Sequence, residues 1–303
     1  MISVILPTRQ RPKLLHQALA SLAAQTYTDF EVLVVNDAGP SLTRPVAAWA
    51  RQLGLDLILV ELPEHRGVSA ARNAGIARSQ GDLLAFLDDD DIVLPGHLDT
   101  AVKHLHTSGD DLVYLGALVA GRRLAQLPDD RLGMPTKAYP YDADFLLVAN
   151  YIHTGSVVTR SFRDSPVHFD ESLTHCEDWD MWLSLTRTLG YRAAFVDALT
   201  SIYHQLPHGS GLVADAQRSV PSPFTVVRRR IHAAWPTRDT HVLAFRVWMD
   251  ALEEHRNQRI AAGLPIPHQM FDAVLGDTHR WFTTGRPPDH ARIPHYFCLQ
   301  EAT

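Results

Sequence analysis

The chain is poor in cysteine, in long apolar runs and in excess positive charge. Its 303 residues include two cysteines, Cys176 and Cys298, which lie far apart in the sequence. Two such residues form neither a disulfide framework nor a zinc knuckle, so we expect reduced thiols and a cytoplasmic protein. No run of about 18 apolar residues occurs, and no basic segment with a long apolar stretch opens the chain, so we expect neither a transmembrane helix nor a signal peptide.

The charge balance and two missing motifs exclude further classes. There are 28 Lys and Arg residues against 34 Asp and Glu residues, a formal net charge of −6. This balance argues against a protein that holds nucleic acid by net basic charge, and we expect no nucleic-acid partner. The G-x-G-x-x-G pattern of dinucleotide-binding folds and the Gly-Lys-Ser/Thr of a P-loop are absent.

Short apolar runs alternate with amphipathic stretches along the first half of the chain. Strands that are apolar throughout and separated by helices are typical of a mostly parallel sheet with helices on both faces. The sequence therefore predicts a Rossmann-like α/β fold. The expected strands are 2–6, 31–35, 55–61, 83–87, 112–118 and 191–196, and the expected helices are 12–22, 43–53, 69–79, 95–107 and 178–188.

A Pro/Ser stretch at 220–223 predicts a linker, and the chain beyond it reads as helical. We expect a catalytic domain over 1–219 and a helical extension over 220–303. The extension could cover the core, form a homodimer surface or shape an acceptor pocket. Its basic triplet, 228–230, is either a peripheral contact with anionic lipid or an acidic partner, or the solvated face of an amphipathic helix.

Polar residues follow three of the predicted strands. They are Thr8-Arg9, Asn36-Asp37 and the run Asp88–Asp91. Ligands of open α/β sheets bind beyond the carboxyl ends of the strands, so we expect these residues at one edge. Four adjacent carboxylates repel one another, and either solvent or a hard cation such as Mg²⁺ or Mn²⁺ must offset that cost. The alternative is a solvated acidic turn that caps the next helix.

Two more segments have both a structural and a functional interpretation. The small residues of 66–75 let a helix start pack closely, and Arg72 in that segment could add charge for an anion. The alternative is a tight helix start with a surface arginine. In 176–182, the acidic Glu177 and Asp178 are either caps of a helix or a carboxylate placed to accept a proton.

In this order along the chain, these segments resemble the inverting family 2 glycosyltransferases of the GT-A fold. The resemblance covers about residues 1–210. The matching pieces are SVILPTRQRP, FEVLVVNDAGP, RGVSAARNAGIARSQGDLLAFLDDDDIVLPGHL, FDESL and EDWDMWLSL. The third and fifth of them are specific to the family.

The resemblance implies a role for each matching residue. Asp178 is the catalytic base, and Asp90 is the ligand of a divalent cation, Mn²⁺ or Mg²⁺. Asp89 and Asp91 remain substitutes for Asp90, because four adjacent aspartates can be aligned with the family's pattern in more than one way. The late histidine of the family, at the metal or the phosphates, is His208 or else His204. The residues expected to hold the nucleotide sugar are Pro7, Thr8, Arg9, Asp37, Arg72, Asp88, Asp89 and Glu177.

The implied function is metal-dependent transfer, with inversion, of a sugar from a nucleoside diphosphate sugar to an acceptor hydroxyl. A UDP-sugar is the favoured donor, and the acceptor is a saccharide, a lipid carrier or a small molecule. Two alternatives remain: a non-catalytic subunit that binds nucleotide sugars, and a sugar nucleotidyltransferase. The second usually needs a Gly-rich loop after the first strand, but no glycine precedes Gly39. Arg9 also stands where the family often has an aromatic residue.

Overall fold

The computed structural model describes residues 1–206, 219–267 and 270–298, and in them the chain forms two compact units. The first unit comprises 1–141, 152–172 and 180–205, and the second comprises 142–151, 173–179 and the described residues from 206 onward. The sequence division at 219 places the two short earlier segments in the first domain. They join the C-terminal helices because, for example, Arg246 Nε donates a hydrogen bond to the carbonyl oxygen of Leu147 at 2.8 Å.

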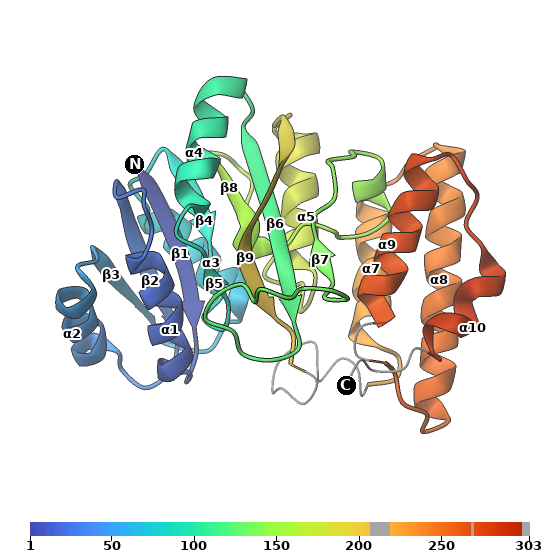
Figure 1. The fold of residues 1–303 in the computed structure, drawn as a ribbon, viewed down its shortest axis with the longest axis horizontal. Coiled ribbons are helices and arrows are strands. Elements are labelled where there is room, and N and C mark those ends of the chain that lie inside the picture. The colour runs from blue at the N-terminus through green and yellow to red at the C-terminus, as the bar shows by residue number, and fades with distance from the viewer. Residues whose placement is uncertain (207–218, 268–269, 299–303) are drawn as a thin grey trace. The chain divides into compact units, whose positions relative to one another are not determined.

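A mixed sheet forms the centre of the first unit (Figure 1). The strands β3, β2, β1 and β4 run parallel, β8 runs antiparallel between β4 and β6, and β9 runs parallel to β6. Two short strands are antiparallel additions, β5 on β9 and β7 on β6. The bounds are β1 Ile2–Thr8, β2 Phe30–Asp37, β3 Leu57–Leu62, β4 Leu83–Phe86, β5 Ile92–Val93, β6 Leu112–Ala120, β7 Thr136–Lys137, β8 Val157–Arg160 and β9 Ala193–His204.

Helices cover both faces of this sheet, as the apolar strands predict. Leu6 of the fully buried β1 belongs to one core with α1, α2 and α4, whereas Ile5 faces α3. A Cβ on Gly75 of α3 would lie 2.7 Å from Ile5 Cγ2, which explains the small residues predicted to allow close packing there. The bounds are α1 Pro12–Ala23, α2 Thr43–Leu53, α3 Val68–Arg78, α4 His97–Ser108 and α5 Glu177–Leu183, which continues as a π-helix over Ser184–Thr188.

The parallel strands bring their carboxyl ends to one edge. Thr8 at the end of β1 pairs in register with Asn36 near the end of β2, and the run of aspartates follows β4 directly. Since β8 is antiparallel to both β4 and β6, the strands β6 and β9 end at this same edge, at Ala120 and His204. The edge expected from the sequence therefore also receives two later strands.

The described part of the second unit is helical. Val242, Phe245, Trp248, Met249 and Leu252 form a buried stripe on α8. None of the helices in the described part of the chain combines the length and the apolar character needed to cross a bilayer. The bounds are α7 Pro223–Ala234, α8 Thr240–Ala261, α9 Met270–Thr283 and α10 Ile293–Tyr296, with short 3₁₀ turns at Phe145–Leu147 in this unit, at Thr154–Ser156 in the first unit and at His290–Arg292.

The basic triplet of α7 does not form one solvated face. Arg228 is buried, and its Nη2 lies 3.2 Å from Glu253 Oε1. Arg229 is exposed, with its Nε 3.8 Å from Asp250 Oδ1. The expected basic face thus loses Arg228, because a guanidinium buried against a carboxylate is not available to a lipid surface.

We predict that His97 makes the fold acid-sensitive. It is buried in α4 with its Nδ1 2.9 Å from Thr200 Oγ1, and burial lowers the pKa of His97 from its ordinary value of 6.5 to about 4. Between these two values the unfolded chain binds a proton that the folded chain does not, so the free energy of unfolding falls as the pH drops. One such group accounts for a loss of up to about 3 kcal/mol.

Replacing His97 with glutamine removes this titration. Urea denaturation at several pH values between about 4 and 7 is expected to give a flatter slope of unfolding free energy for His97→Gln than for the wild type. Equal slopes for the two proteins would contradict the prediction.

Candidate active site

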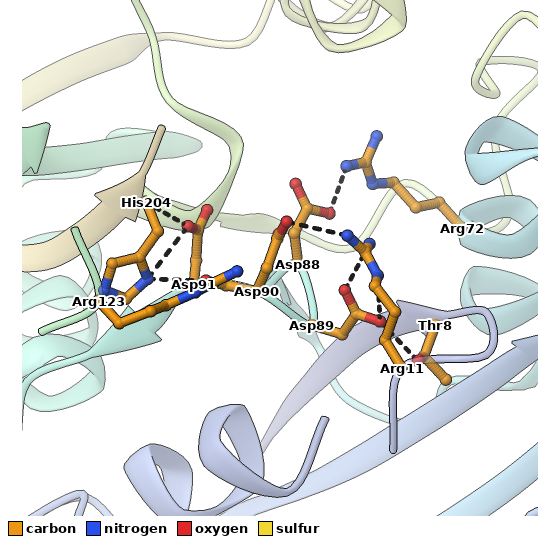
Figure 2. Close-up of polar contacts among 9 residues, drawn as sticks. All are labelled: Thr8, Arg11, Arg72, Asp88, Asp89, Asp90, Asp91, Arg123 and His204. Atoms are coloured by element: carbon orange, nitrogen blue, oxygen red, sulfur yellow. Dashed lines mark hydrogen bonds and ion pairs between the residues drawn. The ribbon is translucent and has the colours of Figure 1, made fainter. Parts of the chain in front are cut away.

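Side chains from the end of β1 and from the segments that follow β1, β3 and β4 meet at the carboxyl edge of the sheet (Figure 2). Thr8 ends β1, Arg11 precedes α1, Arg72 lies in α3, and the four aspartates follow β4. Figure 2 shows that the two arginines point toward the aspartates from different elements. Much of the repulsion expected among the four carboxylates is thus offset by the protein's own cations.

The four aspartates alternate between outward and inward positions. The side chains of Asp88 and Asp90 are 31% and 30% exposed. Those of Asp89 and Asp91 are 0% and 2% exposed. This two-residue alternation leaves two carboxylates accessible at the edge and uses the other two inside the protein.

Asp88 is paired with a buried arginine. Nη2 of Arg72 donates to Asp88 Oδ1 at 2.7 Å, and the guanidinium carbon of Arg72 lies 5.3 Å from the centre of the Phe169 ring. Burial disfavours the charged carboxylate, but the charge and the hydrogen bond of Arg72 outweigh it and hold the pKa of Asp88 below its ordinary value. Arg72, which we expect to place a charge near the phosphates, is thus 2% exposed and already fixed in place.

Asp89 is held by the end of β1. The Thr8 hydroxyl donates to Asp89 Oδ2 at 2.6 Å, and Arg11 contacts both carboxylate oxygens, with Nη2 2.6 Å from Oδ1 and Nε 3.2 Å from Oδ2. Burial raises the pKa of Asp89 to about 6, against the opposing charge of Arg11. The hydroxyl of Thr8, expected at the nucleotide, is engaged with this carboxylate.

The charge of Asp90 is unfavourable in the folded protein. Burial raises its pKa to about 7, with repulsion from Asp91 adding to the rise and Arg11 opposing it. Nη1 of Arg11 donates to Asp90 Oδ2 at 3.0 Å. A partly exposed carboxylate whose charge is poorly compensated by the protein is a favourable place for a cation.

The accessible pair suits a hard divalent cation held jointly with substrate. Among the described residues no three His, Cys, Asp or Glu side chains converge on a metal-sized position. Mg²⁺ and similar ions are often bound by one or two carboxylates, with substrate phosphates and water supplying the other ligands. Asp90 provides such a carboxylate at the accessible edge, with Asp88 beside it, so the residues present fit the cation that the sequence predicts.

Asp37, expected at the base and ribose, anchors the loop before α3. Its Oδ1 accepts the backbone N–H of Arg66 at 2.8 Å, and its Oδ2 accepts that of Gly67 at 2.9 Å. The ring Nδ1 of His65 lies 2.6 Å from Oδ2. Near it, Pro7 is buried and Arg9 is exposed. The structure thus brings the predicted residues of β1, β2, α3 and the aspartate run to one edge.

Glu177 and Asp178 begin α5 and lie in the second unit. Asp178 Oδ1 accepts the backbone N–H of Trp179 at 2.8 Å. The Trp179 ring is buried, donates from Nε1 to the carbonyl oxygen of Leu146 at 2.6 Å and packs edge-on against His232. These contacts fix the start of the helix on which the predicted base stands.

The resemblance offers two histidines, His204 and His208, for the metal or the phosphates. Both ring nitrogens of His204 contact backbone atoms, with Nδ1 2.7 Å from the carbonyl oxygen of Asp90 and Nε2 3.1 Å from the amide nitrogen of Leu124. This arrangement leaves His204 without a free ring nitrogen for a metal. His208 lies outside the described residues.

Three residues of this edge are not among the predicted ones. Arg11 binds two aspartates, His153 Nε2 lies 3.3 Å from Asp91 Oδ2, and Arg123 Nη1 donates to the carbonyl oxygen of Asp90. An arginine before a helix and an isolated histidine usually indicate solvated or structural positions. Only the unbalanced charge of four adjacent aspartates signals that internal cations are needed.

Comparison with known proteins decides the family. The family model described as glycosyl transferase family 2 matches residues 3–164, more than half of the chain. The chain belongs to glycosyltransferase family 2. The resemblance inferred from the sequence is confirmed, and the protein is a glycosyltransferase.

This glycosyltransferase has relatives in several bacteria. It is 30% identical over 217 residues to the uncharacterized glycosyltransferase YwdF of Bacillus subtilis, which covers 71% of the chain and 78% of YwdF. It is 28% identical over 292 residues to the uncharacterized glycosyltransferase RP339 of Rickettsia prowazekii, with 93% and 78% covered. It is 35% identical over 123 residues to the succinoglycan biosynthesis protein ExoW of Rhizobium meliloti, with 40% and 38% covered.

Solved structures share the fold of this glycosyltransferase. Residues 1–349 of TarS from S. aureus match with a TM-score of 0.59 at 18% identity, covering 94% of the chain and 92% of TarS 1–349. The mannosyltransferase PcManGT from Pyrobaculum calidifontis matches with a TM-score of 0.57 at 18% identity, covering 97% and 85%. The predicted GT-A architecture, with helices after it, is therefore confirmed.

Proposed function

We propose that this glycosyltransferase transfers a sugar, with inversion and dependent on a divalent cation, from a nucleoside diphosphate sugar to an acceptor hydroxyl. The observation that carries the proposal is the outward pair Asp88 and Asp90, next to the buried Arg72 at the carboxyl edge. Two accessible carboxylates beside a fixed guanidinium suit a ligand that combines a diphosphate with a cation. The acceptor is a saccharide, a lipid carrier or a small molecule.

The structural neighbours support this class of donor. TarS has been crystallised with UDP and with UDP-GlcNAc, and PcManGT with GDP-Man and Mn²⁺. We favour a UDP-sugar as donor and Mn²⁺ or Mg²⁺ as the cation. The two neighbours bind different bases, so a donor screen must include both uridine and guanosine nucleotides.

We assign the chain's residues to donor binding as follows. Pro7, Thr8, Arg9 and Asp37 border the base and ribose, Asp88 faces the ribose, and Arg72 lies near the phosphates. Asp90 holds the cation, with His208 as a second ligand. The cation, when bound, neutralises negative charge that develops on the departing diphosphate. Asp89 supports the donor-binding residues from inside by holding Thr8 and Arg11 in place. Glu177 contributes to donor binding from the start of α5.

Asp178 acts as the general base in this proposal. An alcohol is a weak nucleophile until its proton is removed, and a positioned carboxylate typically accelerates such a step about 10²- to 10⁴-fold. One base that activates a hydroxyl opposite the leaving group gives inversion at the anomeric carbon. The proton passes from the acceptor oxygen to a carboxylate oxygen of Asp178, and the bond electrons leave with the diphosphate.

Thermal denaturation with nucleotides tests donor binding. We expect a nucleoside diphosphate or its sugar, with Mn²⁺, to raise the melting temperature by about 5 °C when present at about 100 times its Kd, because a ligand that binds only the folded state stabilises it. Mn²⁺ alone and the nucleoside alone are the controls, and we expect each to shift the melting temperature less. The proposal fails if none of the uridine or guanosine nucleotides stabilises the protein.

A further inference from the structure

His204 joins three chain segments at the carboxyl edge. It is the last residue of β9, and its side chain is 2% exposed. Its backbone N–H donates to Asp91 Oδ1 at 2.8 Å, and its ring Nδ1 lies 2.7 Å from the carbonyl oxygen of Asp90. Its Nε2 lies 3.1 Å from both the amide nitrogen and the carbonyl oxygen of Leu124. The end of β9 is therefore bonded to the aspartate run and to the segment after β6.

These contacts place a proton on Nδ1 of the imidazole ring. A carbonyl oxygen only accepts, so Nδ1 must carry the proton that it donates to Asp90. In the neutral ring Nε2 then accepts the N–H of Leu124. Both nitrogens are satisfied by backbone groups, which is the usual state of a buried polar side chain.

The peptide of Asp90 is held from two sides. Its carbonyl oxygen accepts from His204 Nδ1 and from Arg123 Nη1 (Figure 2). The neighbouring Asp91 is held by the His204 backbone and lies 3.3 Å from His153 Nε2. The backbone from which the outward side chain of Asp90 projects is therefore held at its carbonyl group.

We propose that His204 is a positioning residue: its Nδ1–H holds the carbonyl of Asp90, so that the Asp90 carboxylate points outward to receive the cation. The inference rests on the proposed role of Asp90. His204 does not ligate the metal, because its two nitrogens are engaged with backbone groups. It holds the backbone of the residue that supplies the metal carboxylate, and the loss of a residue that orients a metal ligand typically weakens metal affinity about 10- to 100-fold.

Three variants separate this role from a general effect on folding. His204→Ala removes both ring bonds, whereas His204→Asn places an amide N–H close to where Nδ1–H stood and keeps the bond to Asp90. His97→Ala is the matched control, because His97 is also buried and contacts β9 through Thr200, with its Nδ1 2.9 Å from Oγ1. Urea denaturation of the three variants shows whether each remains folded.

The readout is the Kd of Mn²⁺ in the presence of UDP, measured by isothermal titration calorimetry. We expect His204→Ala to weaken Mn²⁺ binding about tenfold and His204→Asn to stay within about twofold of the wild type. His97→Ala should bind as the wild type does. The proposal is overturned if His204→Ala binds Mn²⁺ normally, or if His204→Asn is as weak as His204→Ala.

A second readout needs no metal. In ¹⁵N spectra of histidine-labelled protein, Nδ1 of His204 is expected to carry a proton, and protonation at Nε2 alone would overturn the proposal. Asp90→Asn distinguishes failure of the inference from failure of the proposed function. If Asp90→Asn binds Mn²⁺ as tightly as the wild type does, the cation role of Asp90 is wrong whatever His204 does.

Discussion

Replacing Asp178 with asparagine is expected to slow sugar transfer by about 10²- to 10⁴-fold while donor affinity stays within about twofold of the wild type. Asparagine keeps the oxygen that accepts the N–H of Trp179, so the start of α5 retains its 2.8 Å bond. What it loses is the ability to take a proton from the acceptor. The measurement is the rate of transfer at saturating donor, together with the Kd of the donor for both proteins.

Asp180→Asn is the matched control for this prediction. Asp180 lies two residues further along the same helix and is also half-buried. The Asp180→Asn substitution removes the same charge at nearly the same place. We expect its rate of sugar transfer to lie within about threefold of the wild type, since most such substitutions outside a site have small effects. If Asp178→Asn transfers sugar as fast as Asp180→Asn does, Asp178 is not the base.

Much of the first unit could be predicted because each element carries its own local signal. The helix over 43–53 has the predicted bounds, and the predicted strands over 2–6 and 112–118 extend by about two residues in the structure. The strand β8 could not be predicted in this way. It has four residues in an irregular stretch, and it is defined by pairing with Leu84 on one side and Val113 on the other.

The location of the candidate site could be predicted from the sequence, but the arrangement of its side chains could not. Parallel strands determine that Thr8, Asp37 and the aspartate run share an edge. Which aspartates point outward depends on partners distant in sequence, such as Arg11, 78 positions before Asp89. No local pattern around Arg11 or His204 indicates these contacts. The union of 142–151 with the C-terminal helices likewise depends on long-range bonds such as that from Arg246.

Asp90→Asn is expected to stabilise the metal-free protein at alkaline pH and yet to abolish the effect of Mn²⁺. The folded pKa of Asp90 is raised to about 7, chiefly by burial, so its charge destabilises the folded state above that pH. Between about pH 4 and 7 the folded chain binds a proton that the unfolded chain has lost, so the free energy of unfolding falls as the pH rises. Asparagine carries no charge and removes this decline.

Denaturation with a chelator present, at about pH 5.5 and 8.5, measures this effect: Asp90→Asn should gain stability over the wild type at both pH values and more at the higher one, because the decline is only partly complete at about pH 5.5. Mn²⁺ with UDP should then stabilise the wild type alone.

Asp91→Ala is the contrasting variant, because the buried carboxylate of Asp91 accepts the N–H of His204. Its loss should cost about 2–4 kcal/mol of unfolding free energy at either pH. Equal stability of the wild type and Asp90→Asn at about pH 8.5 would show that the charge of Asp90 is not unfavourable. That result would remove the physical reason for placing the cation there, because a carboxylate already compensated by the protein gains little from a metal.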